Sequence, residues 1–285
     1  MNLQLPITNY QLGLIGYPLG HSLSPKIHTA ALQASGLEGN YSLFPIHPDD
    51  KKGLNNLLAR VRSGEIHGLN VTIPHKQNVI EFMDELTPTA KAIGAVNTIY
   101  MRADKLIGDN TDAPGFLSDL KRGSNSSFST PHSALVLGAG GSARAVVYAL
   151  VNDGWNVTIA ARRLEQAKQL AQSFPNYQLL ITNLDDLQPL TFDLIVNTTP
   201  LGMTPNIETS PLPENIILSK NTFVYDLVYN PRETKLVRDA RAQGLNASTG
   251  LGMLIEQAAL AFEKWTGHNP PREVLFEAVG ATRPD

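Results

Sequence analysis

The sequence predicts an α/β protein of two domains with a cleft between them, and three observations support this fold class. Its 285 residues exceed the usual length of one domain, so two domains are expected. Short β-type runs alternate with amphipathic segments of helix length, which is typical of a mixed or mostly parallel sheet with helices on its faces. A polar, serine-rich stretch at 122–132 has no periodicity and indicates a loop between two such units.

The first part of the chain is expected to form five strands and three helices. Pro25 and Pro48 stand where a first helical turn tolerates a missing N–H, so they indicate where two of the helices begin. The strands are expected over 11–16, 41–46, 68–73, 95–102 and 105–108, and the helices over 25–35, 48–62 and 75–83.

A second unit is expected to start with the apolar run 134–137, directly after the serine-rich loop. Strands are expected at 156–160, 194–197 and 222–227, with a helix over 144–152 after the first apolar run. The last part of the chain is again helical, over 251–265 and 272–279. Periodicity alone does not assign this last part to either unit.

Composition narrows the class of protein. Hydrophobic residues make up 42% and charged residues 17%, which supports a sizeable core. The net charge of −3 gives no electrostatic reason for binding nucleic acid or a membrane surface. There are no cysteines, and the seven histidines show no metal-ligand spacing, so no metal is expected. We see no signal peptide and no stretch of the ~18 apolar residues that a membrane helix needs, so the expected location is cytoplasmic.

The segment Gly138-Ala139-Gly140-Gly141-Ser142-Ala143 follows an expected strand and opens an expected helix. In that context, it fits the G-x-G-x-x-G/A fingerprint of dinucleotide-binding Rossmann domains. The glycines permit a tight turn and a close approach of the backbone to a pyrophosphate, while the helix N-terminus supplies N–H groups. We therefore predict a dinucleotide site on residues 138–142.

The end of the next expected strand indicates which dinucleotide binds. NAD enzymes commonly have an acidic residue there for the ribose hydroxyls. This chain has Arg162 and Arg163 instead, and guanidinium groups bind a 2′-phosphate with charge-assisted hydrogen bonds. The predicted cofactor is therefore NADP, although the two arginines could also simply follow the end of a strand.

Polar side chains gather in four short segments of the first part, 22–25, 70–76, 95–98 and 108–112. Asn70 and Thr72 alternate along one strand and face the same side, with Lys76 beyond its end. Ligands of open α/β sheets bind at such carboxyl ends. The residues alone indicate a small polyhydroxylated or carboxylated substrate beside NADP.

Each of these polar residues also has an ordinary explanation. Ser24 before Pro25 can be the N-cap of a helix, and Lys76 can be a solvated lysine. Asn97 and Asp112 belong to types that are common in turns. Asp109 competes with Asp112 for a catalytic role, and spacing does not choose between them.

Taken together, the segments resemble the shikimate dehydrogenase family over almost the whole chain. The resemblance rests on Ser-Leu-Ser-Pro at 22–25, Asn-Val-Thr-Ile-Pro-His-Lys at 70–76, Gly-Ala-Val-Asn-Thr at 94–98, Asp-Asn-Thr-Asp at 109–112, Gly-Ala-Gly-Gly at 138–141, Asn-Thr-Thr-Pro-Leu-Gly-Met at 197–203, Asp-Leu-Val-Tyr-Asn-Pro at 226–231 and Gly-Leu-Gly-Met-Leu-Ile-Glu-Gln-Ala at 250–258. One departure is Ala161-Arg162-Arg163, where the family often has Asn-Arg-Thr; the second guanidinium replaces the lost amide.

The resemblance implies a role for each candidate residue. The substrate carboxylate would bind Ser22, Ser24 and Tyr229, the ring hydroxyls would bind Thr72, Asn97, Asp112 and Gln257, and Asn70 would line the site. NADP would lie on Gly138, Ala139, Gly140, Gly141 and Ser142, with Arg162 and Arg163 at its phosphate and Thr198, Leu227, Gly250 and Met253 at its nicotinamide end.

The resemblance also assigns the C-terminal helix to the first domain. It predicts a substrate-binding and catalytic domain at 1–111 plus 247–285 and a Rossmann dinucleotide-binding domain at 112–246. Lys76 and Asp112 would be the catalytic pair. Because a neighbouring carboxylate favours the charged form of an amine, we expect a chiefly protonated Lys76 that donates to the developing carbonyl oxygen, with Asp112 orienting it.

The implied activity is the NADPH-dependent reversible reduction of 3-dehydroshikimate to shikimate in the shikimate pathway, which leads to chorismate and the aromatic amino acids. Alternatives are a quinate/shikimate dehydrogenase of the same fold and a catalytically inactive NADP-binding regulator; a one-carbon-folate dehydrogenase is more distant. The expected partner is a small-molecule substrate, and a homodimer is a possible assembly. Neither nucleic acid nor a membrane is expected to bind.

Overall fold

The computed structural model describes residues 7–123, 132–183, 191–214 and 216–283. The chain divides into two compact units. The first unit contains the chain up to Thr111 and again from Gln257 onward, and the second contains Asp112–Glu256. Each unit is built around one six-stranded sheet, which confirms the predicted α/β class.

The first unit has a mixed sheet with strand order β2-β1-β3-β5-β6-β4. β1 pairs in parallel with β2 and β3, whereas β5 runs antiparallel to both β3 and β6. The strands are β1 Tyr10–Gly16, β2 Gly39–Pro45, β3 Gly68–Val71, β4 Glu85–Leu86, β5 Thr98–Arg102 and β6 Lys105–Asp109.

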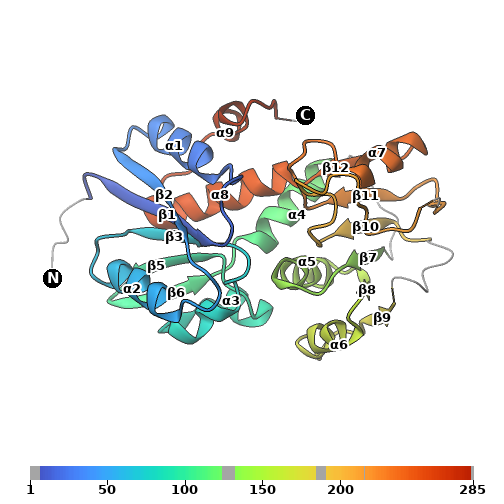
Figure 1. Ribbon diagram of the computed structural model, residues 1–285, viewed down its shortest axis with the longest axis horizontal. Coiled ribbons are helices and arrows are strands. Elements are labelled where there is room, and N and C mark those ends of the chain that lie inside the picture. The colour runs from blue at the N-terminus through green and yellow to red at the C-terminus, as the bar shows by residue number, and fades with distance from the viewer. Residues whose placement is uncertain (1–6, 124–131, 184–190, 215, 284–285) are drawn as a thin grey trace. The chain divides into compact units, whose positions relative to one another are not determined.

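Helices cover both faces of this first sheet (Figure 1). The helices of this unit are α1 Ser24–Ala34, α2 Lys51–Arg62, α3 Pro88–Ile93 and α9 Arg272–Ala278, with a 3₁₀ turn η1 at Asn78–Phe82. α8, Leu251–Thr266, begins in the second unit and continues into this one. The main core lies under α2, where Leu54, Leu58 and Val61 pack on Leu69 and Ile99 of the sheet.

The second unit has an all-parallel sheet with strand order β12-β11-β10-β7-β8-β9. β10 and β11 are fully buried along their length, which is typical of parallel strands covered on both faces. The strands are β7 Ser133–Leu137, β8 Asn156–Ala160, β9 Leu180–Thr182, β10 Leu194–Asn197, β11 Phe223–Asp226 and β12 Ala247–Thr249.

The helices of the second unit lie on opposite faces of its sheet, α4, α5 and α6 on one and α7 on the other (Figure 1). Their bounds are α4 Asp112–Gly123, α5 Gly141–Asn152, α6 Leu164–Gln172 and α7 Lys235–Ala242. Leu236 and Ala240 of α7 pack on Ile195 and Val224 of the strands. Parallel strands with helices on both faces form the predicted Rossmann-type arrangement.

Several predicted bounds need correction. The helix predicted at 48–62 begins only at Lys51, because the Asp50 side chain accepts the Gly53 amide at 2.8 Å and caps it there. The helix predicted at 75–83 is reduced to the short η1, and the strand predicted at 95–102 begins at Thr98. Of the loop predicted at 122–132, the first two residues end α4, and 124–131 lie outside the described residues.

The predicted return to the first domain at residue 247 is also too early. β12 pairs with β11 through Val224–Ala247 and the two following pairs, so residues 247–249 belong to the second sheet. The change of unit falls at Glu256 and Gln257, inside α8. A helix that continues across a boundary gives no break in periodicity, so the sequence pattern could not locate this point.

Candidate active site

Three polar residues of the first unit, Thr98, Thr111 and Gln257, hydrogen-bond the buried side chain of Asn97. Its Oδ1 accepts hydrogen bonds from the Thr111 backbone amide at 2.7 Å and from the Thr98 hydroxyl at 2.9 Å. Its Nδ2 donates to Thr111 Oγ1 at 2.9 Å and to Gln257 Oε1 at 3.3 Å. These bonds hold the Asn97 amide in one orientation and join the predicted substrate residue Gln257 to the strand ends.

Asn70, the third residue of β3, extends this network. The Tyr41 hydroxyl donates to Asn70 Oδ1 at 2.7 Å, and Asn70 Nδ2 donates to the Asn97 carbonyl at 3.3 Å. The His28 ring stacks on Tyr41 with ring centroids 4.4 Å apart and planes 3° from parallel. Burial lowers the pKa of His28 to about 3, so a neutral ring supports the Tyr41–Asn70 contact at neutral pH.

Ser22 and Ser24 lie at the start of α1. The Ser24 backbone amide donates to Ser22 Oγ at 3.2 Å. The N-cap of α1 is Leu23, and no side chain caps this helix end. Ser24 is therefore not the N-cap that its position before a proline suggests, which removes the ordinary explanation for its buried hydroxyl.

Thr72 and Lys76 lie on the segment after β3. The Thr72 backbone amide donates to the Ile15 carbonyl at 2.8 Å, and the Lys76 carbonyl accepts from the Val96 amide at 2.7 Å. The second bond fixes the backbone of Lys76 beside the residue that precedes Asn97. Lys76 is partly buried, so the ordinary explanation of a fully solvated lysine does not apply.

The structure gives Asp109 a structural role. Its Oδ1 accepts from the Thr87 hydroxyl and from the Asn110 amide, both at 2.7 Å. Its Oδ2 lies 2.8 Å from Lys264 Nζ on α8. Partial burial lowers the pKa of Lys264, but the hydrogen bond and charge of Asp109 outweigh it and raise that pKa overall. This ion pair occupies the carboxylate and favours Asp112 for the catalytic role.

Asp112 is the first residue of α4, is 4% exposed and follows Thr111 directly. A carboxylate at a helix N-terminus is stabilised by the helix dipole. Lys76 belongs to the first unit and Asp112 to the second, so their pairing stays a prediction.

In the second unit, the glycine turn after β7 has the conformation that its sequence predicts. Gly138 has φ +110°, and its amide donates to the Ala160 carbonyl at 2.8 Å. A Cβ at Gly138 would lie 2.7 Å from Thr198 Oγ1, so a side chain is excluded on both counts. Gly138 therefore allows the loop after β7 to contact the loop after β10.

The N-terminus of α5 fits a dinucleotide phosphate. Its N-cap is Gly140, no side chain caps this end, and the first turn contains no acidic residue. A Cβ at Gly140 would meet nothing within 4 Å, so the backbone is open on that side. Ala143 is fully buried where the helix packs on the sheet. Ala139, Gly141 and Ser142 are partly exposed at this end.

The other predicted cofactor residues also follow the carboxyl ends of parallel strands. Arg162 and Arg163 follow β8 and are exposed, and Thr198 follows β10. Leu227 follows β11 and Gly250 follows β12, and a Cβ at Gly250 would overlap the Leu227 backbone. The sheet thus presents all of these positions at its carboxyl edge, where α/β proteins bind ligands.

Tyr229 and Met253 are the remaining predicted residues of this unit. Burial raises the pKa of Tyr229 above its ordinary value of 10, so the hydroxyl stays protonated and can donate to a carboxylate at neutral pH. Met253 is 7% exposed on the first turns of α8.

One buried network was missed from the sequence. Asp226 Oδ1 accepts from Asn197 Nδ2 at 2.8 Å and from the Val228 amide at 3.0 Å, and its Oδ2 accepts from the Thr234 hydroxyl at 2.6 Å. Burial raises the pKa of Asp226 to about 6, although these hydrogen bonds lower it. The network fixes the loops after β10 and β11. Asn197 and Asp226 each begin one of the family motifs, at 197–203 and 226–231, but no local pattern indicated that their side chains pair.

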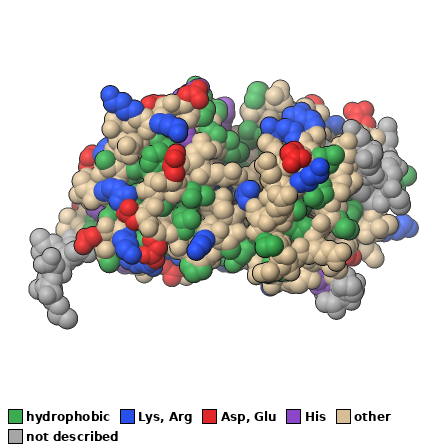
Figure 2. Space-filling model, turned by 90° about the horizontal axis from the view of Figure 1, so that it is seen from below, with side chains coloured by type: hydrophobic (Ala, Val, Ile, Leu, Met, Phe, Trp, Pro, Cys, Tyr) green, Lys and Arg blue, Asp and Glu red, His purple; other side chains and the backbone are tan. Residues whose placement is uncertain are grey.

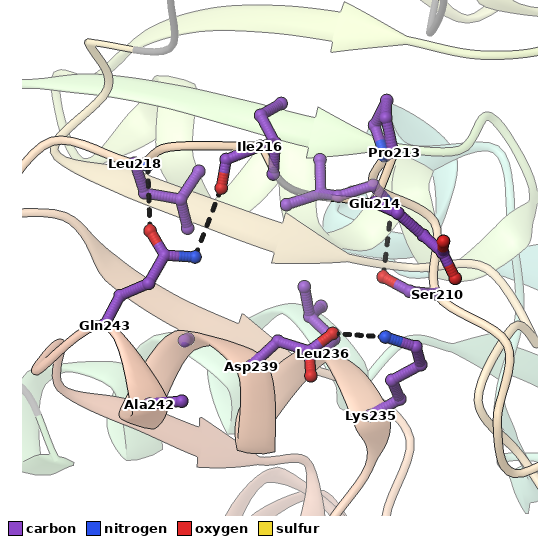
Figure 3. Close-up of a pocket in the computed structure, with 12 residues that line it drawn as sticks. Ser210, Pro213, Glu214, Ile216, Leu218, Lys235, Leu236, Asp239, Ala242 and Gln243 are labelled. Carbon is purple, nitrogen blue, oxygen red and sulfur yellow. Dashed lines mark hydrogen bonds and ion pairs between the residues drawn. The ribbon is translucent and has the colours of Figure 1, made fainter.

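A cavity of about 270 Å³ lies elsewhere in the second unit, between α7 and residues 210–218 (Figure 3). Its walls include Leu212, Leu236 and the Lys235–Asp239 ion pair of 2.6 Å. The Gln243 side chain in its wall accepts from the Leu218 amide at 3.1 Å and donates to the Ile216 carbonyl at 3.2 Å. None of the predicted site residues lines this cavity.

The surface carries charges of both signs. On the face displayed in Figure 2, lysine and arginine side chains are spread among acidic ones. Within the described ranges, no group of three or more His, Cys, Asp or Glu residues could hold a metal ion. None of the helices in the part of the chain that the structure describes is long and apolar enough to span a membrane.

Family models match three consecutive parts of the chain. The shikimate dehydrogenase substrate binding domain matches residues 14–99, shikimate / quinate 5-dehydrogenase matches 124–236, and the shikimate 5′-dehydrogenase C-terminal domain matches 250–279.

Relatives and solved structures match over nearly full length. A protein of Carboxydothermus hydrogenoformans named shikimate dehydrogenase (NADP(+)) is 42% identical, covering 94% of this chain and 95% of the relative. The crystal structure of shikimate 5-dehydrogenase from Thermus thermophilus in complex with NADP(H) and shikimate is 39% identical with a TM-score of 0.84, covering 94% of this chain and 98% of that one. The structure of quinate dehydrogenase from Corynebacterium glutamicum in complex with NAD is 31% identical with a TM-score of 0.86. The match covers 95% of this chain and 98% of that one.

Proposed function

Because the chain belongs to the shikimate dehydrogenase family, we propose that it catalyses the NADPH-dependent, reversible reduction of 3-dehydroshikimate to shikimate. The observation that supports this most is the 42% identity, over 94% of the chain, to a relative named for that activity and cofactor. The reaction belongs to the shikimate pathway, which supplies chorismate and the aromatic amino acids.

NADP fits the residues at the carboxyl edge of the second sheet. The uncapped N-terminus of α5 and the open backbone at Gly140 suit a pyrophosphate, which backbone N–H groups and the helix dipole would stabilise. The exposed guanidinium groups of Arg162 and Arg163 would bind the 2′-phosphate, which NAD lacks. We assign the nicotinamide end to Thr198, Leu227, Gly250 and Met253.

The substrate would bind among the polar residues of the first unit. Ser22 and Ser24 at the start of α1, with the protonated hydroxyl of Tyr229, are donors suited to a carboxylate. We assign the ring hydroxyls to Thr72, Asn97, Asp112 and Gln257, with Asn70 lining the site. The fixed amides of Asn70 and Asn97 support this assignment, because preorganised polar groups lose little freedom on binding.

Lys76 and Asp112 would do the proton chemistry. When bound, NADPH supplies the hydride that reduces the substrate carbonyl. We place the Lys76 ammonium at the carbonyl oxygen, to which it donates a proton as negative charge develops. The Asp112 carboxylate would orient that amine. Support for the role of Lys76 comes from the family match and from the backbone at that position, where the Lys76 carbonyl accepts a hydrogen bond from the Val96 amide at 2.7 Å.

A second candidate is a quinate/shikimate dehydrogenase, favoured by the 31% identity to a quinate dehydrogenase bound to NAD. One experiment separates the two: initial rates of cofactor reduction with shikimate or quinate, each with NADP or NAD. We expect the highest kcat/KM for shikimate with NADP. Equal or better rates with quinate would support the second candidate, and no reduction in all four reactions would contradict both.

The location and assembly are proposals as well. We propose that the enzyme works in the cytoplasm, which a chain without cysteine suits, since it needs no oxidising compartment for disulfides. A homodimer is our proposal for its assembly, and light scattering after size exclusion would show the molar mass in solution.

A further inference from the structure

A buried ionic cluster in the second unit connects α4, α8 and β11. It consists of Asp119 and Arg122 on α4, Tyr225 on β11 and Glu256 on α8. Their side chains are almost fully enclosed: those of Asp119, Arg122 and Glu256 are 10%, 18% and 7% exposed, and Tyr225 is 1% exposed as a whole. None of the four was a site candidate in the sequence.

The bonds of the cluster form a continuous chain. The Tyr225 hydroxyl donates to Asp119 Oδ2 at 2.6 Å, and the Arg122 guanidinium donates to Asp119 Oδ1. The same guanidinium donates to Glu256 Oε1 at 3.1 Å. The backbone amide of Met253 also bonds the Tyr225 hydroxyl. One turn of α8, from Met253 to Glu256, is therefore bonded at both ends.

α4 and α8 pack closely at this point. A Cβ at Gly252 would overlap the Asp119 carboxylate, so α8 can approach α4 this closely only because Gly252 has no side chain. The Phe116 ring, on the same face of α4, meets the Tyr225 ring edge-on with centroids 5.2 Å apart. Such fully satisfied buried networks hold their elements in one arrangement.

The turn that the cluster holds contains Met253 and ends directly before Gln257. These are residues that we assign to the nicotinamide and to a substrate hydroxyl, and α4 itself begins with Asp112. We infer that Asp119, Arg122, Tyr225 and Glu256 are positioning residues that set where α8 presents Met253 relative to Asp112 within the second unit. This inference rests on the proposed function, and it adds residues that touch neither substrate nor cofactor.

Three variants test the inference. Tyr225→Phe removes only the hydroxyl, Glu256→Ala removes the Arg122 acceptor on α8 while Asp119 remains, and Glu256→Gln keeps an acceptor oxygen of the same reach. Because misplacement of substrate-binding groups lowers rates strongly, we expect Tyr225→Phe and Glu256→Ala to lower kcat/KM for shikimate by about tenfold or more. Glu256→Gln should stay within about threefold of wild type, because the hydrogen bond to Arg122 remains.

A matched control separates positioning from general stability. Thr222→Val removes a hydrogen bond of the same unit, from Thr222 Oγ1 to the Phe192 carbonyl at 2.7 Å, between the residues that lead into β11 and β10. It should lower Tm and leave kcat and KM unchanged. If Tyr225→Phe and Glu256→Ala behave in the same way, or if Glu256→Gln loses as much kcat/KM as Glu256→Ala, the inference is wrong. The wild type is measured first, because a wild type inactive with shikimate and NADP would contradict the proposed function itself.

Discussion

The buried imidazole of His28 should make the first unit sensitive to acid. Its pKa is about 3 in the folded protein and 6.5 ordinarily, so below pH 6.5 the unfolded chain binds a proton that the folded chain does not. Stability from this group is fully present above pH 6.5 and is lost progressively as the pH falls toward 3. At 1.36 kcal/mol per pKa unit, the full loss of unfolding free energy is about 5 kcal/mol. About 2 kcal/mol of it is lost by pH 5.

The perturbation that isolates this effect is His28→Phe. Phenylalanine keeps an aromatic ring to stack on Tyr41 and removes both ring nitrogens, which are buried. At pH 7, we expect the variant to be as stable as the wild type or slightly more stable. Between pH 7 and pH 5, the wild type should lose about 2 kcal/mol more than the variant.

Urea unfolding followed by tryptophan fluorescence measures this difference. The chain has two tryptophans, and Trp265 lies 5.2 Å from His28 between ring centroids. In a Trp155→Phe background, the signal therefore reports the unit that contains His28. His268→Gln, at an exposed histidine, is the control and should follow the wild type. A constant difference between wild type and His28→Phe from pH 7 to pH 5 would refute the reasoning.

Three further predictions concern the second unit. For Asp226, whose pKa burial raises to about 6 from 3.8, stability is greatest below pH 3.8 and falls as the pH rises through 6. Asp226→Asn should therefore gain about 2 kcal/mol relative to wild type between pH 4 and pH 7 in urea unfolding, and a pH-independent difference would contradict this. Arg162→Ala and Arg163→Ala should each raise KM for NADP about tenfold and leave KM for NAD nearly unchanged, since charge-assisted hydrogen bonds to the 2′-phosphate are lost; equal effects on both cofactors would count against the assignment. Gly138→Ala should cost about 1–3 kcal/mol in thermal unfolding, because of its positive φ and the approach to Thr198, whereas an unchanged Tm would show that the turn adapts.

Local patterns were enough to predict the first strand, turn and helix of the dinucleotide half, although they missed β9 and β12. The apolar run before Gly138 and the helix after it form β7 and α5, and the arginines at 162 and 163 follow β8. These features depend on residues close in sequence: apolar strands buried on both faces and a turn that only glycine can form. The same reasoning failed for α3, which has six residues, although Thr87 caps it and Gly94 ends it at φ +69°.

The features that the sequence did not predict depend on distant residues. Spacing could not choose between Asp109 and Asp112, because the ion pair that occupies Asp109 comes from Lys264 on α8. Likewise, the partners of Asp226 and Asn197 come from separate strands, and 134 positions separate Arg122 from Glu256. The helix predicted at 75–83 also fails because of a distant residue. The Lys76 carbonyl accepts from the Val96 amide, which favours a turn at this point over a regular helix.

The most direct test of the proposed chemistry compares the wild type with Lys76→Ala in a single assay, NADPH formation from shikimate and NADP. Wild type should form NADPH at a steady rate. The variant should lower kcat by about three orders of magnitude, as expected for a lost general acid or base, while KM for shikimate changes by no more than about threefold. A wild type that forms no NADPH, or a Lys76→Ala variant that keeps its kcat, would contradict the account.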